Sequence, residues 1–346
     1  MTRLERLCAA LEEPLLVTGG VNVRYLTGLS SSNAALLVQP GGETTLYTDF
    51  RYLEKAAAVE GVELVQTARD VIGALASALS GRRIGFEPAH VTFAGYERLV
   101  AAGIDLVPNH GVVEALRAVK EPSEIAAIRQ AASVSDEVYG ALAHERFTGR
   151  TERDLAWWIE QAFHDAGASA LAFGSIVASG PDGASPHAEP SHRVIERGTL
   201  VTVDAGCVAD GYCSDCTRTF STGDLPASLA DAYGACLQGQ LDGLAAVRPG
   251  ASGRDVDAVS RVAIDAAGLG ERYGHGLGHG VGLEVHEAPT LRPESADALE
   301  AGNIVTVEPG IYLPGVGGVR IEDLVLVTED GAETLTHFTK ELTTVG

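Results

Sequence analysis

The sequence has few basic side chains for its length. It carries 25 Lys and Arg against 47 Asp and Glu in 346 residues, a formal net charge of −22. Nucleic acid is not expected as a partner, because its phosphates require a basic protein face. Residues 1–120 hold 13 acidic and 11 basic side chains, whereas residues 121–346 hold 34 and 14. This asymmetry serves solubility, and it also suits a domain that collects cations.

Long apolar runs and a secretory signal are also lacking. No apolar run reaches the roughly 18 residues of a membrane span, so no membrane-spanning helix is expected. Glu5, Arg6, Glu12 and Glu13 interrupt the region where a signal peptide needs an apolar stretch. Five cysteines are an odd number, which without an export signal favours free thiols in a reducing cytoplasm.

The composition that is present is globular. Hydrophobic residues make up 45% of the chain and aromatic residues 5%, enough apolar material for a sizeable core. A chain of 346 residues exceeds what one core usually organises, so we expect two domains. A Lys-Glu-Pro break within Leu116–Ser123 precedes a helical pattern at Glu124–His144. We therefore expect domains of residues 1–118 and 119–346.

The N-terminal part alternates short β-type runs with segments of helical spacing. Strands are predicted at Leu15–Thr18, Ala34–Gln39, Thr44–Thr48 and Arg83–Phe86, and helices at Arg51–Val59, Ala68–Leu79 and Gly95–Ala102. The pattern predicts a small mixed α/β domain without obvious chemistry of its own.

The C-terminal part contains a unit that occurs twice. The corresponding segments are 149–167 with 250–268, 196–206 with 300–310, and HAEP at 187–190 with HEAP at 286–289. The first pair carries a Thr or Ser helix cap and a final Gly, which are helix start and stop signals. A repeated helix-then-strand unit predicts a pseudo-two-fold domain with a site between its halves. Chance similarity of common motifs is the alternative.

Two acids of the first unit are predicted to point to one place. The Asp-Gly pair at 210–211 is a favoured two-residue hairpin turn, which would place Gly206 opposite Asp215. Asp204 then lies diagonal to Asp215 on the same face, with Cβ atoms about 7–8 Å apart. A longer, four-residue loop would place the two acids directly opposite each other.

The second unit repeats this arrangement with glutamates. Glu308 follows the same Val-Thr-Val run as Asp204, and Glu322 lies 14 residues later, past the turn-rich LPGVGG. An even separation across a symmetric hairpin brings both glutamates to one face, which Arg320 shares. Four converging carboxylates repel one another unless cations neutralise them. The two pairs therefore favour a metal site over four separate solvated acids.

The segment YGHGLGHGVGLEVHE at 273–287 adds imidazoles. Its alternating glycines are unfavourable in a helix by about 1 kcal/mol each, so we expect an extended segment with His275 and His279 on one face. It is neither an HExxH zinc helix nor a dinucleotide-binding fingerprint. Cys213 and Cys216 form a CxxC, but in an extended strand they point to opposite faces and would not chelate together.

These motifs resemble those of the pita-bread metallopeptidases, in particular the prolidase and aminopeptidase P branch. NVRYLTGLSSSNAALLV and TDFRYLEKA are similar to that branch's N-terminal domain, and LRAVKEPSEIAAIRQA is similar to its linker. The resemblance implies an α/β (α+β) fold, with a small creatinase/prolidase-like N-terminal α/β domain followed by a pseudo-two-fold pita-bread domain. The family's five metal ligands fall on Asp204, Asp215, His279, Glu308 and Glu322.

The resemblance implies a pair of divalent metal ions. Asp204 would hold one ion and His279 with Glu308 the other, while Asp215 and Glu322 would bridge both. This oxygen-rich donor set suits Mn²⁺, and less exclusively Co²⁺ or Zn²⁺.

The reaction implied by the resemblance is hydrolysis of an Xaa-Pro bond. The metal pair would lower the pKa of a shared water, and Glu308 would act as general base. His286 and His187 would bind substrate and stabilise the oxyanion. His275 and Arg320 would be further site residues, with Arg320 equally interpretable as a structural partner of a site glutamate, Glu322. The preference for proline, and a homodimer, are expected from the resemblance alone.

One position departs from the prolidase pattern. Prolidases often carry an arginine directly after the proline of HExP, where it can hold a dipeptide's C-terminal carboxylate. Here that position is Thr290, and the nearest arginine is Arg292. This departure favours longer peptides, whereas the short connection between Glu308 and Glu322 resembles prolidases.

The preferred function is therefore an Xaa-Pro dipeptidase (prolidase), with an Xaa-Pro aminopeptidase acting on longer peptides as the alternative. A methionine aminopeptidase usually lacks the whole N-terminal domain, and a metal-free creatinase lacks this ligand set. A non-catalytic peptide-binding module of the same fold characteristically loses ligands, whereas all five are present here.

Overall fold

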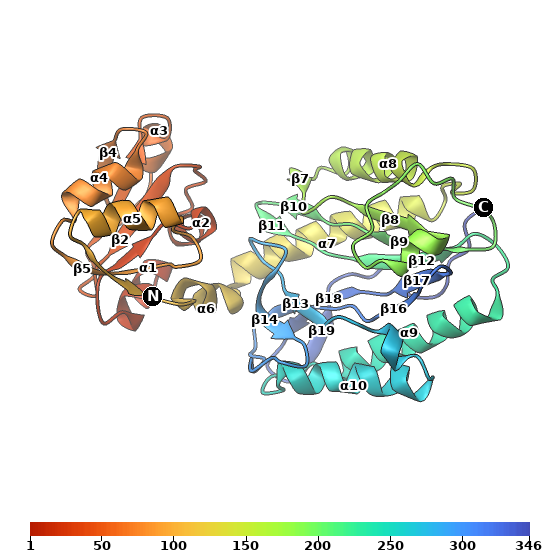
Figure 1. Ribbon diagram of the computed structural model, residues 1–346. Helices are drawn as coiled ribbons and strands as arrows, with labels where there is room; N and C mark the ends of the chain where they lie inside the picture. Colours follow the sequence, from red (N-terminus) through yellow and green to blue (C-terminus); the bar gives the residue numbers. More distant parts are fainter. The chain divides into compact units, whose positions relative to one another are not determined.

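The computed structural model describes residues 1–346 and divides them into two compact units (Figure 1). The first unit is Met1–Arg117 and the second is Ala118–Gly346. Both combine helices with strands, so the expected mixed α/β class is confirmed. No helix combines the length and the apolar character needed to cross a membrane.

The first unit is built on a six-stranded sheet. Its elements in chain order are α1 (Arg3–Ala10), β1 (Leu15–Val17), α2 (Gly20–Thr27), β2 (Ala34–Val38), β3 (Thr44–Asp49), α3 (Leu53–Ala56), β4 (Glu63–Thr67), α4 (Val71–Ala78), β5 (Arg83–Phe86), α5 (Phe93–Ala101), β6 (Asp105–Pro108) and α6 (Val112–Ala118). The strand order is β4-β3-β2-β1-β5-β6, antiparallel from β3 to β1 and parallel at both ends. Leu75 of α4 and Leu99 of α5 are fully buried against apolar side chains of the sheet.

The predicted elements of this unit are present with one clear exception, whereas α1, α2, β4, β6 and α6 were not predicted from the sequence. The four predicted strands are present, each ending within one residue of its expected end. The helix predicted at Arg51–Val59 is reduced to the single turn α3, because Asp49 fixes a turn just before it. The Asp49 carboxylate accepts hydrogen bonds from the Arg51 backbone N–H at 3.0 Å and from Arg51 Nη2 at 2.6 Å.

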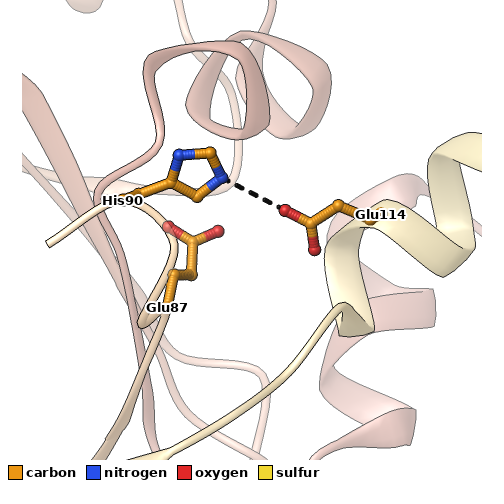
Figure 2. Close-up of side chains that lie close together, drawn as sticks. All are labelled: Glu87, His90 and Glu114. Carbon is orange, nitrogen blue, oxygen red and sulfur yellow. Dashed lines mark hydrogen bonds and ion pairs between the residues drawn. The ribbon is translucent and has the colours of Figure 1, made fainter. Parts of the chain in front are cut away.

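Glu87, His90 and Glu114 come together in the first unit (Figure 2). His90 Nε2 lies 3.2 Å from Glu114 Oε1. The amide of Asn22 fills the space between the two carboxylates, since its Nδ2 donates to Glu87 Oε1 and to Glu114 Oε1 at 2.6 Å each. Arg117 in turn donates to Asn22 Oδ1 at 2.8 Å. Because the protein's own amide satisfies these oxygens, the cluster is a hydrogen-bond network that ties α2 to α6.

The second unit carries the repeated pattern of helices and strands. Its elements are α7 (Pro122–Leu142), α8 (Glu152–Asp165), β7 (Ala170–Leu171), β8 (Ile176–Ser179), η1 (Gly180–Ala184), β9 (Leu200–Asp204), β10 (Cys207–Ala209), β11 (Tyr212–Cys213), β12 (Thr217–Ser221), α9 (Ala227–Ala246), α10 (Gly253–Ala266), η2 (Gly270–Arg272), β13 (Gly278–Gly280), β14 (Glu287–Leu291), β15 (Ile304–Val307), β16 (Gly310–Leu313), β17 (Gly317–Arg320), β18 (Asp323–Val327) and β19 (Ala332–Thr334). The sheets are β11-β10-β7, β12-β9-β8, β14-β13-β15-β18-β19 and β16-β17. The pairs α7–α8 and α9–α10 flank the strands of this unit (Figure 1).

Helices α8 and α10 begin and end where the repeated segments predict. Thr151 and Ser252 are their N-caps, and each side chain accepts a hydrogen bond of 3.1 Å from the third residue of its helix. Gly167 and Gly268 follow the two C-termini with φ values of 92° and 74°. These left-handed positions favour glycine, which explains the final Gly of each segment.

The hairpin of the first half keeps the predicted register. Ala209 pairs with Tyr212 across the Asp-Gly turn. The same register continues where β9 pairs with β12, with Asp204 opposite Thr217. Asp215, two residues before Thr217, therefore lies diagonal to Asp204, as the two-residue turn predicts.

The second half repeats this register with its own strands. Val307 at the end of β15 pairs with Asp323 at the start of β18, and the β16–β17 hairpin lies beyond them. Glu308 and Glu322, the next residues along these two strands, consequently face each other. The fold thus places two pairs of acidic residues at equivalent positions of its two halves.

Candidate metal centre and its cavity

A single cavity of about 1610 Å³ in the second unit is lined by every residue predicted for the site. These residues are Asp204, Asp215, His279, Glu308 and Glu322, together with His187, His275, His286 and Arg320. Thr290 and Arg292 line the same cavity. The two halves of the repeat therefore bring together side chains that lie up to 135 residues apart in the sequence, from His187 to Glu322.

The expected imidazole lies among the carboxylates. Asp215, His279 and Glu322 each place one ligand atom within 4.8 Å of the others. His279 Nε2 is 3.7 Å from Asp215 Oδ2 and 3.1 Å from Glu308 Oε1. The Thr306 hydroxyl holds His279 and Glu308 in place. It accepts a hydrogen bond from the backbone N–H of His279 at 3.1 Å and donates one to Glu308 Oε1 at 3.0 Å.

Asp204 and Glu322 each have one oxygen held by the protein and one left without a donor. Arg320 Nη2 donates to Asp204 Oδ2 at 2.6 Å. The Thr217 hydroxyl donates to Glu322 Oε2 at 2.7 Å. Asp204 Oδ1 and Glu322 Oε1 are buried without a hydrogen-bond partner. A buried acceptor without a donor is unfavourable by about 1–3 kcal/mol, and by more when it is charged, so these oxygens suit a cation.

The electrostatics of the carboxylates lead to the same conclusion. Burial raises the pKa of Asp215 well above its usual range, and the charges of Glu322 and Asp204 raise it further. Burial and the charge of Glu308 raise the pKa of Glu322 in the same way. Nearby divalent cations would favour the ionised forms instead. Hard carboxylate oxygens with one imidazole therefore fit divalent metal ions.

Glu308 differs because it contacts an imidazole. Burial acts to raise the pKa of Glu308, but the hydrogen bond with His279, together with the charges of His279, Arg320 and His275, outweighs burial and lowers the pKa to about 2. For His279 burial acts to lower the pKa, but the hydrogen bond to Glu308, the charge of Glu308 and smaller contributions from Gly280 and Asp204 together raise it. Glu308 is therefore ionised at neutral pH and can act as a proton acceptor.

Arg320 pairs with Asp204 and not with Glu322, the partner considered from the sequence. Strand β17 packs against β9, so the guanidinium reaches the end of β9, where Asp204 lies. Its other nitrogens donate to the Tyr312 hydroxyl at 3.0 Å and to Thr217 Oγ1 at 3.2 Å. Arg320 thus orients one carboxylate of the site and fixes two neighbouring hydroxyls.

The three remaining predicted histidines lie on different parts of the cavity wall. His275 Nε2 is 2.8 Å from the Tyr312 hydroxyl, and burial lowers the pKa of His275. The ring of His286 lies edge-on to that of His279, with centroids 4.1 Å apart, and burial lowers the pKa of His286. His187 is exposed on the wall and makes no hydrogen bond within the protein.

Three hydrogen-bonding residues of the site were missed by the sequence reasoning. Thr306 could have been found, because it precedes Glu308 by two residues in the Val-Thr-Val run and so shares its strand face. Thr217 could have been found in the same way, from its position two residues after Asp215. Tyr312 carries no sequence signal, since its contact with Arg320 depends on the β16–β17 hairpin.

Comparison with known proteins assigns the family. Residues 126–329 match metallopeptidase family M24, and residues 3–119 match the creatinase/prolidase N-terminal domain. The chain belongs to metallopeptidase family M24. The predicted family, the predicted two-part fold and the enzyme class of metallopeptidase are therefore confirmed.

Similar proteins within the family include both dipeptidases and aminopeptidases. The chain is 40% identical over 334 residues to the uncharacterized peptidase YqhT of Bacillus subtilis, covering 95% of this chain and 94% of that one. It superimposes on the Xaa-Pro dipeptidase from Bacillus anthracis with a TM-score of 0.95 and 38% identity, covering 99% of both chains. The X-Pro aminopeptidase from Thermotoga maritima gives a TM-score of 0.87 and 31% identity, covering 96% of this chain and 97% of that one.

Proposed function

We propose that the protein is a metal-dependent exopeptidase that hydrolyses the Xaa-Pro bond of dipeptides and short peptides, with dipeptides preferred. The observation that carries the proposal is the gathering of four carboxylates, two of them buried, and one imidazole in one cavity, where two carboxylate oxygens have no donor. The similarity to an Xaa-Pro dipeptidase and an X-Pro aminopeptidase supports the preference for proline.

In this proposal five side chains hold two divalent cations. Asp204 would hold one cation, His279 and Glu308 would hold the other, and Asp215 and Glu322 would contribute to both. The donor chemistry favours Mn²⁺, with Co²⁺ or Zn²⁺ as alternatives. When bound, such cations would acidify a water molecule and polarise the scissile carbonyl.

The protein's own groups then position the substrate and move the proton. Glu308 is ionised, so it accepts the proton of the attacking water and passes it to the leaving imide nitrogen. His286 and His187 line the cavity and donate hydrogen bonds to the substrate carbonyl as its oxygen becomes an oxyanion. His275 and Arg320 keep the Tyr312 hydroxyl fixed between them.

A second candidate function, cleavage of longer peptides, is favoured by the environment of Thr290. Asp297 Oδ2 accepts from the Thr290 backbone N–H at 2.8 Å and from its hydroxyl at 3.0 Å. Thr290 therefore cannot replace the arginine that holds a dipeptide's carboxylate in prolidases. Arg292 lines the cavity, and its guanidinium makes no hydrogen bond or ion pair within the protein. Dipeptide cleavage would depend on Arg292, whereas an Xaa-Pro aminopeptidase would not need it.

Hydrolysis of Gly-Pro and Ala-Pro, compared with Ala-Pro-Xaa peptides in the presence of Mn²⁺, tests the proposal. We expect metal-dependent cleavage of at least one set and its loss in Asp215→Ala and Glu322→Ala, because each residue would bridge both cations. Failure to cleave either set, or full activity in either variant, would contradict the assignment.

We also propose a homodimer that acts in the cytoplasm, with domains of residues 1–118 and 119–346. All five cysteines are buried free thiols, which supports a reducing compartment. The homodimer is supported only by the family resemblance.

A further inference from the structure

The cavity extends beyond the carboxylates to one side of helix α8. Arg153, Trp157 and Glu160 all line it, and their spacing of three to four residues places them on one helix face. The opposite face of α8 is anchored in the core, where Leu155 and Phe163 are fully buried. The packing of the helix thus determines which of its side chains face the cavity.

Trp157 leaves a large apolar surface open to the cavity. Its side chain is 62% exposed although it belongs to a cavity wall. Covering an indole of this size is favourable, and its flat face suits contact with apolar or ring side chains. The cavity of about 1610 Å³ exceeds the roughly 300–1,000 Å³ of small-molecule sites. A dipeptide at the carboxylates would fill only part of it.

Glu152 fixes this wall relative to the segment that carries His187 and His192. Its carboxylate accepts hydrogen bonds from the backbone N–H and hydroxyl of Ser179 at 2.7 and 2.8 Å. It accepts the same two bonds from Ser191, at 3.0 and 2.7 Å. The wall is therefore preorganised, which lowers the entropy lost when a ligand binds.

Arg153 brings a positive charge to the same wall. Its Nη1 lies 3.2 Å from His192 Nε2, and no carboxylate lies within ion-pair distance of its guanidinium. A guanidinium without an acidic partner can bind a carboxylate through two parallel hydrogen bonds. The C-terminal carboxylate of a peptide provides that group.

We propose that Arg153, Trp157 and His192 form a subsite for the residues that follow proline in peptides longer than two residues. An apolar side chain after proline packs on Trp157, and the peptide's C-terminal carboxylate pairs with Arg153. This inference rests on the proposed function and adds longer Xaa-Pro peptides with a free C-terminus to its substrates.

Calorimetric titration of a Glu308→Gln variant with Mn²⁺ present tests the subsite without turnover. We expect Ala-Pro-Phe-Ala to bind about tenfold more tightly than Ala-Pro-Gly-Ala, which lacks the ring, and Trp157→Ala on this background to remove the difference. Val262→Ala is the matched control, because Val262 is 67% exposed on α10 and does not line the cavity. Arg153→Gln should reduce binding of the free-acid peptide to that of its C-terminal amide.

Equal or absent binding of the two peptides, or an unchanged difference in Trp157→Ala, would overturn the inference. A Trp157→Ala variant that changes from dimer to monomer in light scattering would also overturn it, since a second copy would then cover this face. Failure of the proposed function gives a separate result. The unsubstituted protein with Mn²⁺ would then cleave neither peptide. In that case the difference in binding between the two peptides would still show whether the subsite exists.

Discussion

The hydroxyl of Thr217 donates a 2.7 Å hydrogen bond to Glu322 Oε2, while Glu322 Oε1 is buried without a donor. Arg320 Nε in turn donates to the Thr217 oxygen at 3.2 Å, so the hydroxyl hydrogen is directed to the carboxylate. This one contact determines which oxygen of Glu322 remains available for a cation. Thr217 therefore orients a proposed metal ligand without binding the metal itself.

Replacing Thr217 by Val removes this donor and nearly preserves the side-chain shape. Loss of such a supporting hydrogen bond weakens metal binding by about 10- to 100-fold. We expect Thr217→Val to lower Mn²⁺ affinity by that factor in calorimetric titration, and Thr217→Ser to bind Mn²⁺ like the unsubstituted protein. The same affinity in all three proteins would rule out this role.

Arg292 is the cation that we propose for binding a dipeptide's carboxylate. We expect Arg292→Gln to raise the KM for Ala-Pro by about tenfold, as for the loss of one charge-assisted hydrogen bond. The KM for Ala-Pro-amide, which lacks that carboxylate, should change little. Arg272→Gln is the control, because Arg272 is exposed and outside the cavity. Equal effects of Arg292→Gln on both substrates would show that Arg292 does not bind the carboxylate.

Lys120 and Glu287 form a buried ion pair beside the site. Lys120 Nζ lies 2.6 Å from Glu287 Oε1, the two side chains are 1% and 5% exposed, and Glu287 directly follows His286. We expect Lys120→Met to lower the free energy of unfolding by about 3–5 kcal/mol, because it removes the ammonium group from beside a buried carboxylate.

Urea unfolding of the Lys120→Met variant, and of a double variant with Lys120→Met and Glu287→Leu, measures this loss of stability. The double variant should recover part of the loss, since it also replaces the buried carboxylate by an apolar group. A single variant as stable as the parent would refute the prediction.

Glu114 makes the stability of the first unit sensitive to acid. Burial acts to raise the pKa of Glu114, but hydrogen bonds led by that from Asn22 outweigh burial and lower the pKa below its usual value. A lowered folded-state pKa contributes stability that is present above the unfolded-state value, near 4.5, and is lost as the pH falls through the folded-state value.

We therefore expect Glu114→Gln to reduce the free energy of unfolding at neutral pH by about 1 kcal/mol and to flatten its decline below about pH 4.5. Urea unfolding across this pH range measures both effects. Glu97→Gln, at an exposed position of α5, serves as the control. If the free energy of unfolding declines as steeply with falling pH in Glu114→Gln as in Glu97→Gln, Glu114 is not the source of the acid sensitivity.

The features that sequence could predict are those fixed by local chemistry. The Asp-Gly pair at 210–211 favours one tight turn, and that turn sets the register that places Asp204 diagonal to Asp215. The glycines that follow α8 and α10 adopt the left-handed conformation with which helices commonly end, so they mark the two C-termini in the sequence. Such signals lie within a few residues of the feature they specify.

The features that escaped prediction depend on packing between distant segments. The pairing of Arg320 with Asp204 arises because β17 packs across β9, and side-chain spacing within β17 gives no sign of it. Helix α2 begins with Gly20 and contains Val, Tyr and Thr, which have low helix propensity, so tertiary contacts determine its structure. The exposure of Trp157 next to a partly buried Trp158 likewise follows from how α8 is docked.

Counting the divalent cations bound per chain is the most direct test of this account. Mn²⁺ titration, with elemental analysis of the dialysed protein, should give two cations per chain for the unsubstituted protein and for Asp231→Ala, at an exposed position of α9. Asp215→Ala and Glu322→Ala should each bind fewer than two and lose Xaa-Pro hydrolysis. No bound cation in the unsubstituted protein, or two in either site variant, would contradict the claim that these carboxylates hold a metal pair.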